Sequence, residues 1–225
     1  MKNWILYEDN HLIIVNKPSR IPVQGDKTGD ETLLDIIKAY IKKQYNKPGN
    51  VYLGLPHRID RPTSGIVILS KTSKSLSKMS ELFREKKIMK KYWAVVKKPL
   101  RLKSGKLIHL LKKNRSLNKS FVSTKEKKGF LKAELSYMLV KKITNYFLYE
   151  IELISGRHHQ IRVQLSTIGS PIKGDVKYGF SRTNKNSSIH LHARQIKFIH
   201  PIKKTTIEIT APTPADDELW KHCAK

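Results

Sequence analysis

The fold of this chain is best predicted from the stretch Leu55-Pro56-His57-Arg58-Ile59-Asp60-Arg61-Pro62-Thr63-Ser64-Gly65, which leads into the apolar run Ile66-Val67-Ile68-Leu69. An apolar run of this length after turn residues predicts a buried strand from Gly65 to Lys71. Asp60 lies between two arginines in this loop. Such an aspartate can simply terminate a strand. However, nearby guanidinium groups lower a carboxylate pKa by about 1–3 units, which keeps it ionised as a nucleophile or base must be.

Strand-like segments outnumber helix-like ones along the rest of the chain. Turn residues and alternation predict strands at these ranges: Trp4–Glu8, His11–Asn16, Lys91–Val96, Leu107–Leu111, Ser120–Thr124, Leu131–Val140, Tyr146–Leu153, Ile189–Phe198 and Thr205–Thr210. Helical spacing predicts a helix capped by Asp30, a second capped by Ser73, and a third from Arg157 to Ile168 that stops at Gly169. This pattern predicts an α+β fold, with a central mixed, mostly antiparallel sheet flanked by helices.

The composition is that of a folded protein outside the secretory route. The chain has 225 residues, and 39% of them are hydrophobic, which is enough to form a core and argues against disorder. Its single cysteine, Cys223, excludes an intrachain disulfide and a cysteine-rich zinc cluster and favours a reducing compartment, so we expect a cytoplasmic protein. Neither a signal peptide nor a membrane span is expected, because no long apolar run occurs.

A strong positive charge suggests a polyanionic partner. Lys and Arg number 45 against 18 Asp and Glu, for a net charge of +27. A proteome rich in lysine would also give such a total, but the distribution is uneven: residues 86–142 carry 19 Lys and Arg against Glu126 and Glu134. A field of this sign attracts phosphates, so RNA or DNA is the expected partner.

Two further stretches carry residues that suit chemistry. Ser155-Gly156-Arg157-His158-His159-Gln160-Ile161-Arg162 leads into the third predicted helix. There Arg162 is either an exposed cation or a buried one that needs an anion, such as Asp60 or a phosphate. In Lys90-Lys91-Tyr92-Trp93, Tyr92 either packs as an ordinary strand residue or stacks on a nucleobase. The adjacent histidines lack the partners of a metal site, so we expect no metal.

Taken together and in this order, these stretches resemble the RluA branch of the pseudouridine synthases. The resemblance covers nearly the whole chain, through the following segments: Tyr7–Asp9, Val15–Pro18, His57–Gly65, Lys91–Val96, Ser155–Leu165, Gly169–Gly179 and Leu191–Ala193. Residues 57–65 match the signature loop of the family closely. Because strand-like sequence begins at Trp4, the small N-terminal RNA-binding module that is frequent in the family is not expected. We therefore predict a single catalytic domain over residues 1–225.

The resemblance implies a cleft across the sheet and isomerisation of uridine in RNA, without cofactor or metal. It implies that Asp60 is catalytic, that Tyr92 packs on the target base and that Arg162 is the ion-pair partner of Asp60. Other residues of the matching motifs are expected to contact RNA: Lys17, His57, Arg58, Arg61, Thr63, Lys90, Lys91, Arg157 and Gln160. The sequence departs from the family at Ser19-Arg20, at His158 in place of a usual Thr, and at Gln164 in place of a usual His.

The implied reaction needs few groups. The bond from ribose to N1 of uracil breaks, the base rotates, and a bond forms from ribose to C5, so no group enters or leaves permanently. The uridine must leave its stack, at a cost of a few kcal/mol. Asp60 could attack C1′ to form an ester or remove the 2′ proton to form a glycal, and the sequence leaves both routes open. Tyr92 or a water could take the C5 proton.

Two other functions fit part of the sequence. A non-catalytic RNA-binding or ribosome-assembly factor of the same fold would be free to lose Asp60, Tyr92 and Arg162. A base-removing enzyme of the glycosidase type typically needs two carboxylates, and no second acid lies near a motif. We therefore expect a monomeric RNA pseudouridine synthase with no membrane partner, acting on ribosomal or transfer RNA.

Overall fold

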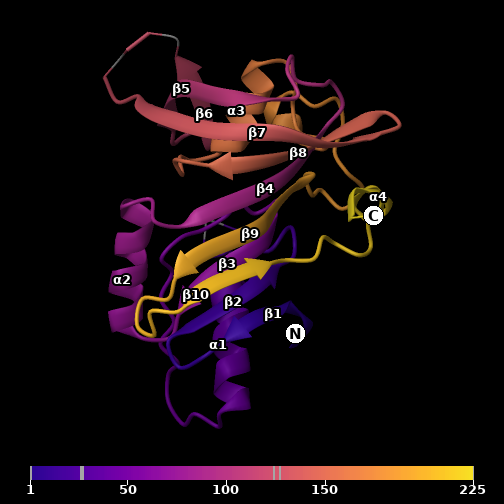
Figure 1. Ribbon diagram of the computed structural model, residues 1–225. Coiled ribbons are helices and arrows are strands. Elements are labelled where there is room, and N and C mark those ends of the chain that lie inside the picture. The colour runs from indigo at the N-terminus through magenta and orange to yellow at the C-terminus, as the bar shows by residue number, and fades with distance from the viewer. Residues whose placement is uncertain (1, 26–27, 124, 127, 225) are drawn as a thin grey trace. The chain divides into compact units, whose positions relative to one another are not determined.

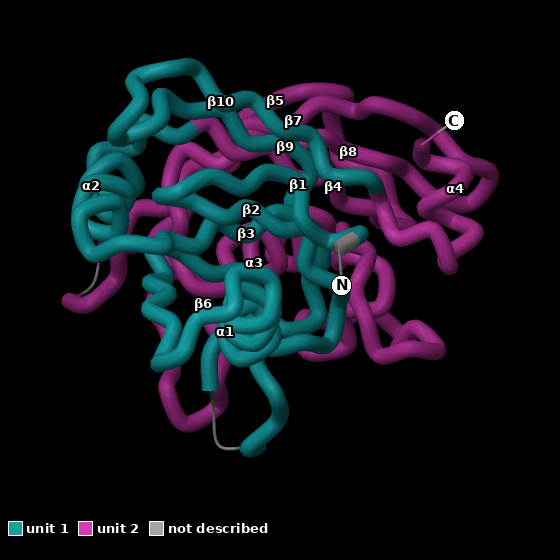
Figure 2. The backbone as a smooth tube through the Cα atoms, turned by 90° about the horizontal axis from the view of Figure 1, so that it is seen from below, with its two compact units in different colours: residues 1–88, 193–212 teal, residues 89–192, 213–225 magenta. Residues whose placement is uncertain are grey.

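The chain forms two compact units, which are coloured separately in Figure 2. The computed structural model describes residues 2–25, 28–123, 125–126 and 128–224, which form ten strands and four α-helices. Unit 1 holds residues 1–88 and 193–212, and unit 2 holds residues 89–192 and 213–225. Each strand pairing with a defined register is antiparallel, which confirms the α+β class and the mostly antiparallel sheet. The single domain over residues 1–225 stays a prediction.

Unit 1 is built on a short sheet with two helices. Its elements are η1 (Lys2–Trp4), β1 (Ile5–Glu8), β2 (Leu12–Lys17), α1 (Leu33–Gln44), β3 (Ser64–Ser70), α2 (Ser73–Arg84), most of β9 (Leu191–Ile199) and β10 (Thr206–Thr210). The strands follow the order β1-β2-β3-β9, with β10 paired to β9 (Figure 1). All seven residues of β3 are buried, as expected for the apolar run, because β3 has a neighbour on both edges and α2 packs against it.

The two N-terminal helix caps differ from the predicted ones. Helix α1 is capped by Thr32, which exchanges hydrogen bonds with Asp35 in a capping box, and not by Asp30. Helix α2 is capped by Thr72, whose hydroxyl accepts from the Ser75 backbone N–H, and not by Ser73. In both cases a threonine in extended conformation directly precedes the first helical residue, which is the geometry a capping side chain requires.

Gly65 allows β9 to approach the first residues of β3. Its φ of +111° lies in a region that side chains disfavour. A Cβ atom at this position would lie 2.4 Å from the Ala193 carbonyl oxygen and 2.5 Å from the Ala193 nitrogen. No other residue type fits there without moving the backbone, so the glycine of the signature loop is a packing requirement.

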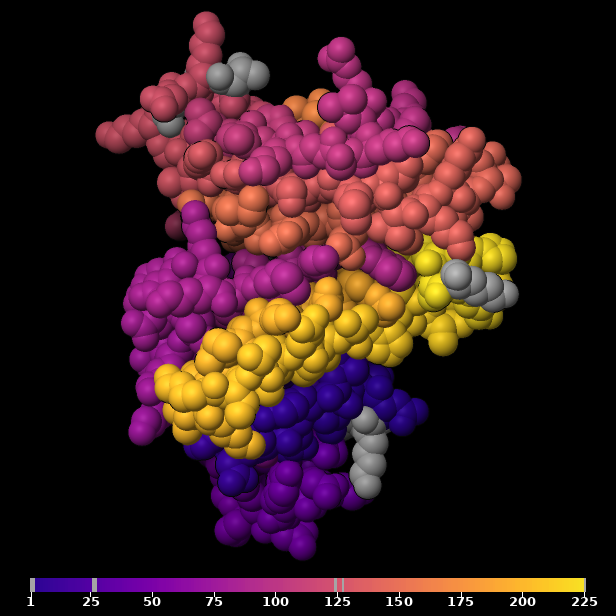
Figure 3. All heavy atoms as spheres, in the orientation of Figure 1, coloured from indigo at the N-terminus to yellow at the C-terminus, as the bar shows by residue number. Residues whose placement is uncertain are grey.

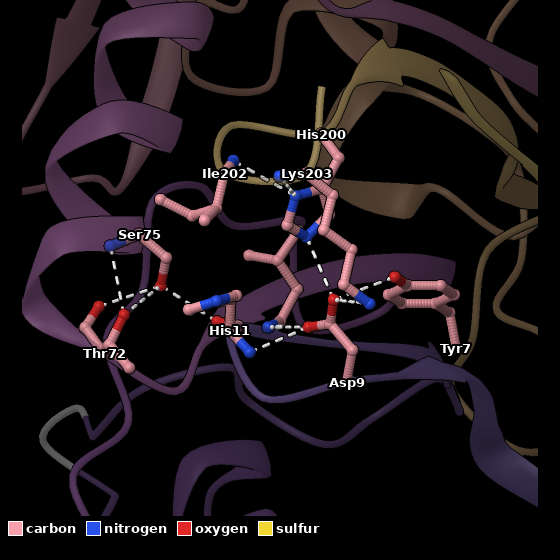
Figure 4. A network of polar contacts seen from close by, with 9 residues as sticks. Tyr7, Asp9, His11, Thr72, Ser75, His200, Ile202 and Lys203 are labelled. Atoms are coloured by element: carbon pink, nitrogen blue, oxygen red, sulfur yellow. Dashed lines mark hydrogen bonds and ion pairs between the residues drawn. The ribbon is translucent and has the colours of Figure 1, made fainter. Parts of the chain in front are cut away.

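A partly buried polar network holds the turns of unit 1 together (Figure 4). The Asp9 carboxylate accepts hydrogen bonds from the backbone N–H groups of His11 and Leu12, both at 2.8 Å. Its Oδ2 atom lies 2.8 Å from Nζ of Lys203 and 3.2 Å from Nε2 of His200, both in the β9–β10 turn. Burial opposes ionisation, but the Lys203 and backbone hydrogen bonds hold the Asp9 pKa well below its ordinary value. Asp9 therefore joins the β1–β2 turn to the β9–β10 turn as an anion.

His200 contributes to this network in its neutral form. Its side chain is fully buried, and its Nδ1 atom accepts hydrogen bonds from the N–H groups of Ile202 and Lys203. Because Nδ1 is an acceptor, the ring proton belongs on Nε2, toward Asp9. Burial lowers the pKa of His200, and the nearby Asp9 charge offsets that only in part.

Strand β10 of unit 1 has one solvated face. Thr206, Glu208 and Thr210 of β10 are exposed, and the two residues between them are half-buried. In the space-filling view the β9–β10 hairpin lies at the surface of unit 1 (Figure 3). This alternation is typical of an antiparallel strand with one face in water.

Unit 2 is a five-stranded antiparallel sheet with helices on both faces. Its elements are β4 (Met89–Val96), β5 (Ser104–Asn114), β6 (Lys119–Ser123), β7 (Leu131–Ile143), β8 (Tyr146–Leu153), α3 (Gln160–Thr167), η2 (Val176–Tyr178) and α4 (Glu218–Ala224). The strands follow the order β4-β8-β7-β5-β6. Thr124, the last residue of a predicted strand, and Lys127 of the basic stretch lie outside the described residues.

The two faces of this sheet carry different helices. On one face, Val163 of α3 packs with Tyr178, Leu111 and Ala133. On the other face, Trp220 and Cys223 of α4 pack with Val95 and Leu148. The sequence analysis missed α4, since seven residues after Pro212 and Pro214 give no helical period of their own. Tertiary packing supplies its stability.

None of the helices in the described ranges combines the length and the apolar character needed to cross a membrane.

We expect Gly65→Ala to lower the free energy of unfolding by about 2 kcal/mol or more, because the added Cβ meets the Ala193 backbone at a positive φ. Urea denaturation with an unchanged m-value measures this effect. Gly49→Ala is the matched control, since nothing lies within 4 Å of its Cβ position. Equal stability of the two variants would contradict the close approach.

We expect the stabilising effect of His200 to weaken as the pH falls from about 7 to 5. Because the folded pKa lies below the ordinary 6.5, the unfolded chain binds a proton there that the folded chain excludes. The loss reaches at most about 1.4 kcal/mol per pH unit. Thermal unfolding at several pH values measures the loss as the difference in free energy of unfolding between the wild type and His200→Gln. The exposed His222→Gln is the control. A gap independent of pH would refute the neutral role.

Candidate functional site

Asp60 lies in a turn directly before β3. It is half-buried and follows the buried Ile59, so its backbone is fixed on one side by the core. The N–H of Thr63 donates to the carbonyl oxygen of Asp60 at 3.0 Å and closes the turn. With Pro62 inside the turn and Gly65 at positive φ after it, the backbone around Asp60 has little freedom.

The ammonium group of Lys17 holds this turn from inside. Lys17 is fully buried, and its Nζ atom donates to the carbonyl oxygens of Pro18, Ile21 and Arg61 at 2.9, 3.0 and 3.2 Å. Burial lowers the pKa of Lys17 to about 7, while the negative charge of Asp60 raises it. All three ammonium protons therefore have protein acceptors. The predicted RNA contact of Lys17 stays a prediction, for which the geometry offers no free donor.

Arg61 connects the Asp60 turn to the segment before α1. Its carbonyl oxygen accepts from the N–H of Arg20 at 2.7 Å, and its Nε donates to the carbonyl oxygen of Arg20 at 2.9 Å. Its NH2 atom lies 2.6 Å from Oδ2 of Asp30. The Arg61 guanidinium thus has a carboxylate partner that the sequence analysis did not name, and Arg58 is exposed. The RNA contacts of both arginines stay predictions.

His57 anchors the start of the signature loop. Its Nε2 atom accepts a hydrogen bond from the N–H of Ile68 at 2.9 Å, and its ring stacks on Phe83 with centroids 4.4 Å apart. Thr63, at 2% exposure, has a hydroxyl group with no hydrogen-bond partner among the described residues. Both residues were predicted to contact RNA, and that role stays a prediction.

In unit 2, Tyr92 lies on the sheet face that carries α3. It pairs with Ile151 of β8, which pairs with Tyr137 of β7, so these side chains point to the same side of the sheet. Tyr92 is 9% exposed. Lys91 points to the opposite face and lies 2.7 Å from Glu150, whereas Lys90 shares the face of Tyr92 by strand alternation.

Arg162 is a buried cation in α3, not an exposed one. Its Nε and NH2 atoms donate to Oδ2 and Oδ1 of Asp175 at 2.7 and 2.8 Å, and the side chains are 5% and 1% exposed. Its guanidinium also lies 5.1 Å from the ring centroid of Tyr178. The bidentate pair fixes the orientation of the guanidinium. Asp175 was missed because a single acid after Gly174 carries no pattern, although the family resemblance included that segment.

Helix α3 begins at Gln160, three residues later than predicted. His159 has a φ of 52°, a left-handed conformation that a helix interior excludes. The Gln160 side-chain oxygen accepts from the Arg157 N–H at 2.9 Å, and its nitrogen donates to the carbonyl oxygen of Glu134 at 3.1 Å. Arg157 is exposed and donates from Nε to the Lys132 carbonyl oxygen. RNA binding by Arg157 and Gln160 stays a prediction.

The two family departures in this segment both make contacts with the sheet of unit 2. The Oγ atom of Ser120 lies 2.9 Å from Nδ1 of His158, and the Nε2 atom of His158 lies 3.2 Å from Oδ1 of Asn118. Gln164 is fully buried and its amide nitrogen donates to the Leu107 carbonyl oxygen at 3.1 Å. Both residues therefore secure α3 to β5 and β6.

The residues predicted to form the site divide between the two units. Unit 1 brings Lys17, Asp60, Arg61 and Thr63 into one hydrogen-bonded turn, and unit 2 carries Tyr92 and Arg162. Among the described residues, no group of three or more His, Cys, Asp or Glu side chains could hold a metal ion.

Two solved structures show the same fold as this chain. Human RNA Pseudouridylate Synthase Domain Containing 4 matches with a TM-score of 0.81 at 24% sequence identity, over 98% of this chain and 92% of that chain. Human RNA Pseudouridylate Synthase Domain Containing 1 matches with a TM-score of 0.75 at 20% identity, over 93% of this chain and 83% of that chain. At this level of identity the likeness concerns the fold.

Sequence comparison identifies the family. The family model described as RNA pseudouridylate synthase matches residues 11–167. The ribosomal large subunit pseudouridine synthase C of Buchnera aphidicola subsp. Baizongia pistaciae is 40% identical over 220 residues, which cover 93% of this chain and 67% of that protein. The protein of the same name from Vibrio cholerae is 32% identical over 221 residues, covering 96% of this chain and 67% of that protein. The chain therefore belongs to the RNA pseudouridylate synthase family of isomerases, as its signature loop predicted.

Proposed function

We propose that this chain isomerises uridine to pseudouridine in the RNA of the large ribosomal subunit, with Asp60 as the carboxylate that acts on the ribose. The names of the relatives from Buchnera and Vibrio favour ribosomal over transfer RNA. One observation supports the role of Asp60. The Thr63 N–H closes the Asp60 turn by a hydrogen bond, and the buried Lys17 donates to the Arg61 carbonyl oxygen within that turn. A carboxylate held in this way keeps its position when a substrate binds.

Two routes are open to the Asp60 carboxylate. In the first, it attacks C1′ of the ribose while the bond to N1 of uracil breaks; after the base rotates, C5 attacks C1′ and releases the carboxylate. In the second, Asp60 removes the 2′ proton as the base leaves, and that proton returns when C5 bonds to C1′. Both routes need an ionised Asp60. Both end when Tyr92 or a water takes the C5 proton and N1 of the uracil gains a proton from solvent.

Tyr92 and Arg162 complete the proposal from unit 2. Tyr92 would stack on the uracil, because a phenol on a buried strand presents a rigid flat surface. Arg162 would pair with Asp60 and keep it ionised. Its bidentate bonds to Asp175 support this role, since they fix the guanidinium plane before any substrate arrives.

We expect Asp60→Asn to abolish the release of tritium from RNA labelled at uridine C5, with a loss of about a thousandfold or more, because an amide neither attacks C1′ nor removes the 2′ proton. The dissociation constant for RNA should change little. Tritium release and filter binding on bacterial large-subunit ribosomal RNA measure the two effects.

Asp216→Asn is the control for charge, since Asp216 is exposed near the end of the chain. It should keep full activity. Full turnover by Asp60→Asn would remove Asp60 from its role. Tritium release from transfer RNA but not from ribosomal RNA would reject the proposed substrate while leaving the reaction intact.

We expect Lys17→Met to lower kcat by about tenfold to a hundredfold while the RNA dissociation constant stays close to that of the wild type. Removing the ammonium takes a donor from the carbonyl oxygens of Pro18, Ile21 and Arg61 and loosens the Asp60 turn. The Arg61 oxygen keeps its second donor, the Arg20 N–H. Steady-state kinetics and filter binding separate the two constants, with the exposed Lys87→Met as control. If RNA affinity fell with kcat intact, Lys17 would be an RNA contact and not a positioning residue.

A further inference from the structure

Three lysines of unit 2 lie at or next to the turn between β5 and β6. Lys113 lies directly opposite Ser120 in the β5–β6 pairing, and Ser120 contacts His158. The Nζ atom of Lys177, in η2, donates to the carbonyl oxygen of Asn118 at 3.3 Å. Lys119 follows Asn118 in the chain. We call Lys113, Lys119 and Lys177 the lysine cluster.

The rings of two aromatic residues border this cluster. The Nζ atom of Lys119 lies 5.3 Å from the ring centroid of Tyr178 and 5.9 Å from that of Phe121. Tyr178 is buried, and its hydroxyl group contacts the Ser120 N–H and Nδ1 of His159. Phe121 is 42% exposed. The cluster therefore has a fixed inner wall and an exposed ring beside it that could stack on a base.

Among the described residues, none of the three ammonium groups lies within ion-pair distance of an acid. Asp175 directly precedes η2, and both of its carboxylate oxygens accept hydrogen bonds from Arg162. Residues 104–123 include five Lys and Arg and no Asp or Glu. Like charges held together without an acid favour the binding of an anion.

The positive potential extends into the protein beneath the cluster. The buried His159 has its pKa lowered to about 2, first by burial and then by nearby groups that include the positive charges of Arg162, Lys177 and Lys113. These groups come from β5, α3 and η2, so their proximity is a product of the fold of unit 2 and does not follow from the sequence order.

The cluster is also accessible and partly fixed in place. Lys113 and Lys177 are exposed, and Lys119 is half-buried. Asn118 has a φ of 44°, which keeps the β5–β6 turn short, and its side chain contacts His158. An anion can reach the ammonium groups without a change in the backbone.

We propose that Lys113, Lys119 and Lys177 bind phosphate groups of the RNA backbone around the β5–β6 turn. The inference rests on the proposed function, which supplies RNA as the polyanion. Ammonium groups contact phosphates as point charges and release condensed counterions, so the contact depends on salt. The site would hold the RNA strand on unit 2 through its backbone, independently of base identity.

The test compares two double variants with the same loss of charge. Lys113→Ala with Lys177→Ala removes two members of the cluster, and Lys97→Ala with Lys98→Ala removes two exposed lysines after β4. Filter binding of bacterial large-subunit ribosomal RNA is measured over a series of salt concentrations. The cluster variant should bind about tenfold more weakly, and its slope of log K against log salt should be smaller by about one to two. The control variant should stay within about twofold of the wild type.

Equal losses in both double variants would overturn the proposal, because total charge alone would then explain the binding. No loss in the cluster variant would overturn it as well. In the tritium assay the cluster variant should keep kcat at saturating RNA with a raised KM, and a lower kcat at saturation would contradict a pure binding role. If the wild type released no tritium, the synthase function would be rejected. The phosphate site would stand in that case if the cluster variant still bound RNA more weakly than the wild type.

Discussion

The candidate site of unit 1 depends on one buried ammonium group. Lys17 is fully buried at the end of β2. It donates to the carbonyl oxygens of Pro18 and Ile21, which follow β2, and to that of Arg61 in the Asp60 turn. Burying a lysine is unfavourable, which is why its pKa falls to about 7. In return, the buried hydrogen bond from Lys17 to the Arg61 carbonyl oxygen joins the Asp60 turn to the end of β2.

A similar constraint organises unit 2. The Arg162–Asp175 pair is buried, so removing either partner would leave an uncompensated charge in the core. Around it, Tyr178 contacts Arg162, His159 and Ser120 and thereby joins η2, α3 and β6. The same packing brings lysines from separate elements to the β5–β6 turn. The rigidity that orients Arg162 and the basic surface beside it thus have a common structural origin.

The local sequence pattern predicted the bounds and burial of strands whose own residues determine them. The strand Tyr146–Leu153 was predicted with its observed bounds, and the apolar run after Gly65 is buried on both faces. The prediction failed where the structure of an element depends on its surroundings in the fold. Thr32 and Thr72, not Asp30 and Ser73, cap their helices, because capping depends on the conformation of one residue. Helix α4 was missed because its stability comes from packing on the sheet.

The sequence by itself determined the α+β class, the buried strand β3, the family and the residues to which catalysis is assigned, since each of these is encoded in contiguous motifs or in alternation. Only the tertiary structure decided what those residues touch. Asp175 as the partner of Arg162, Asp30 as the partner of Arg61 and the enclosure of Lys17 all join segments separated along the chain. Ion pairs and hydrogen bonds act over a few ångströms in space, and distance in space is set by the fold and not by position in the sequence.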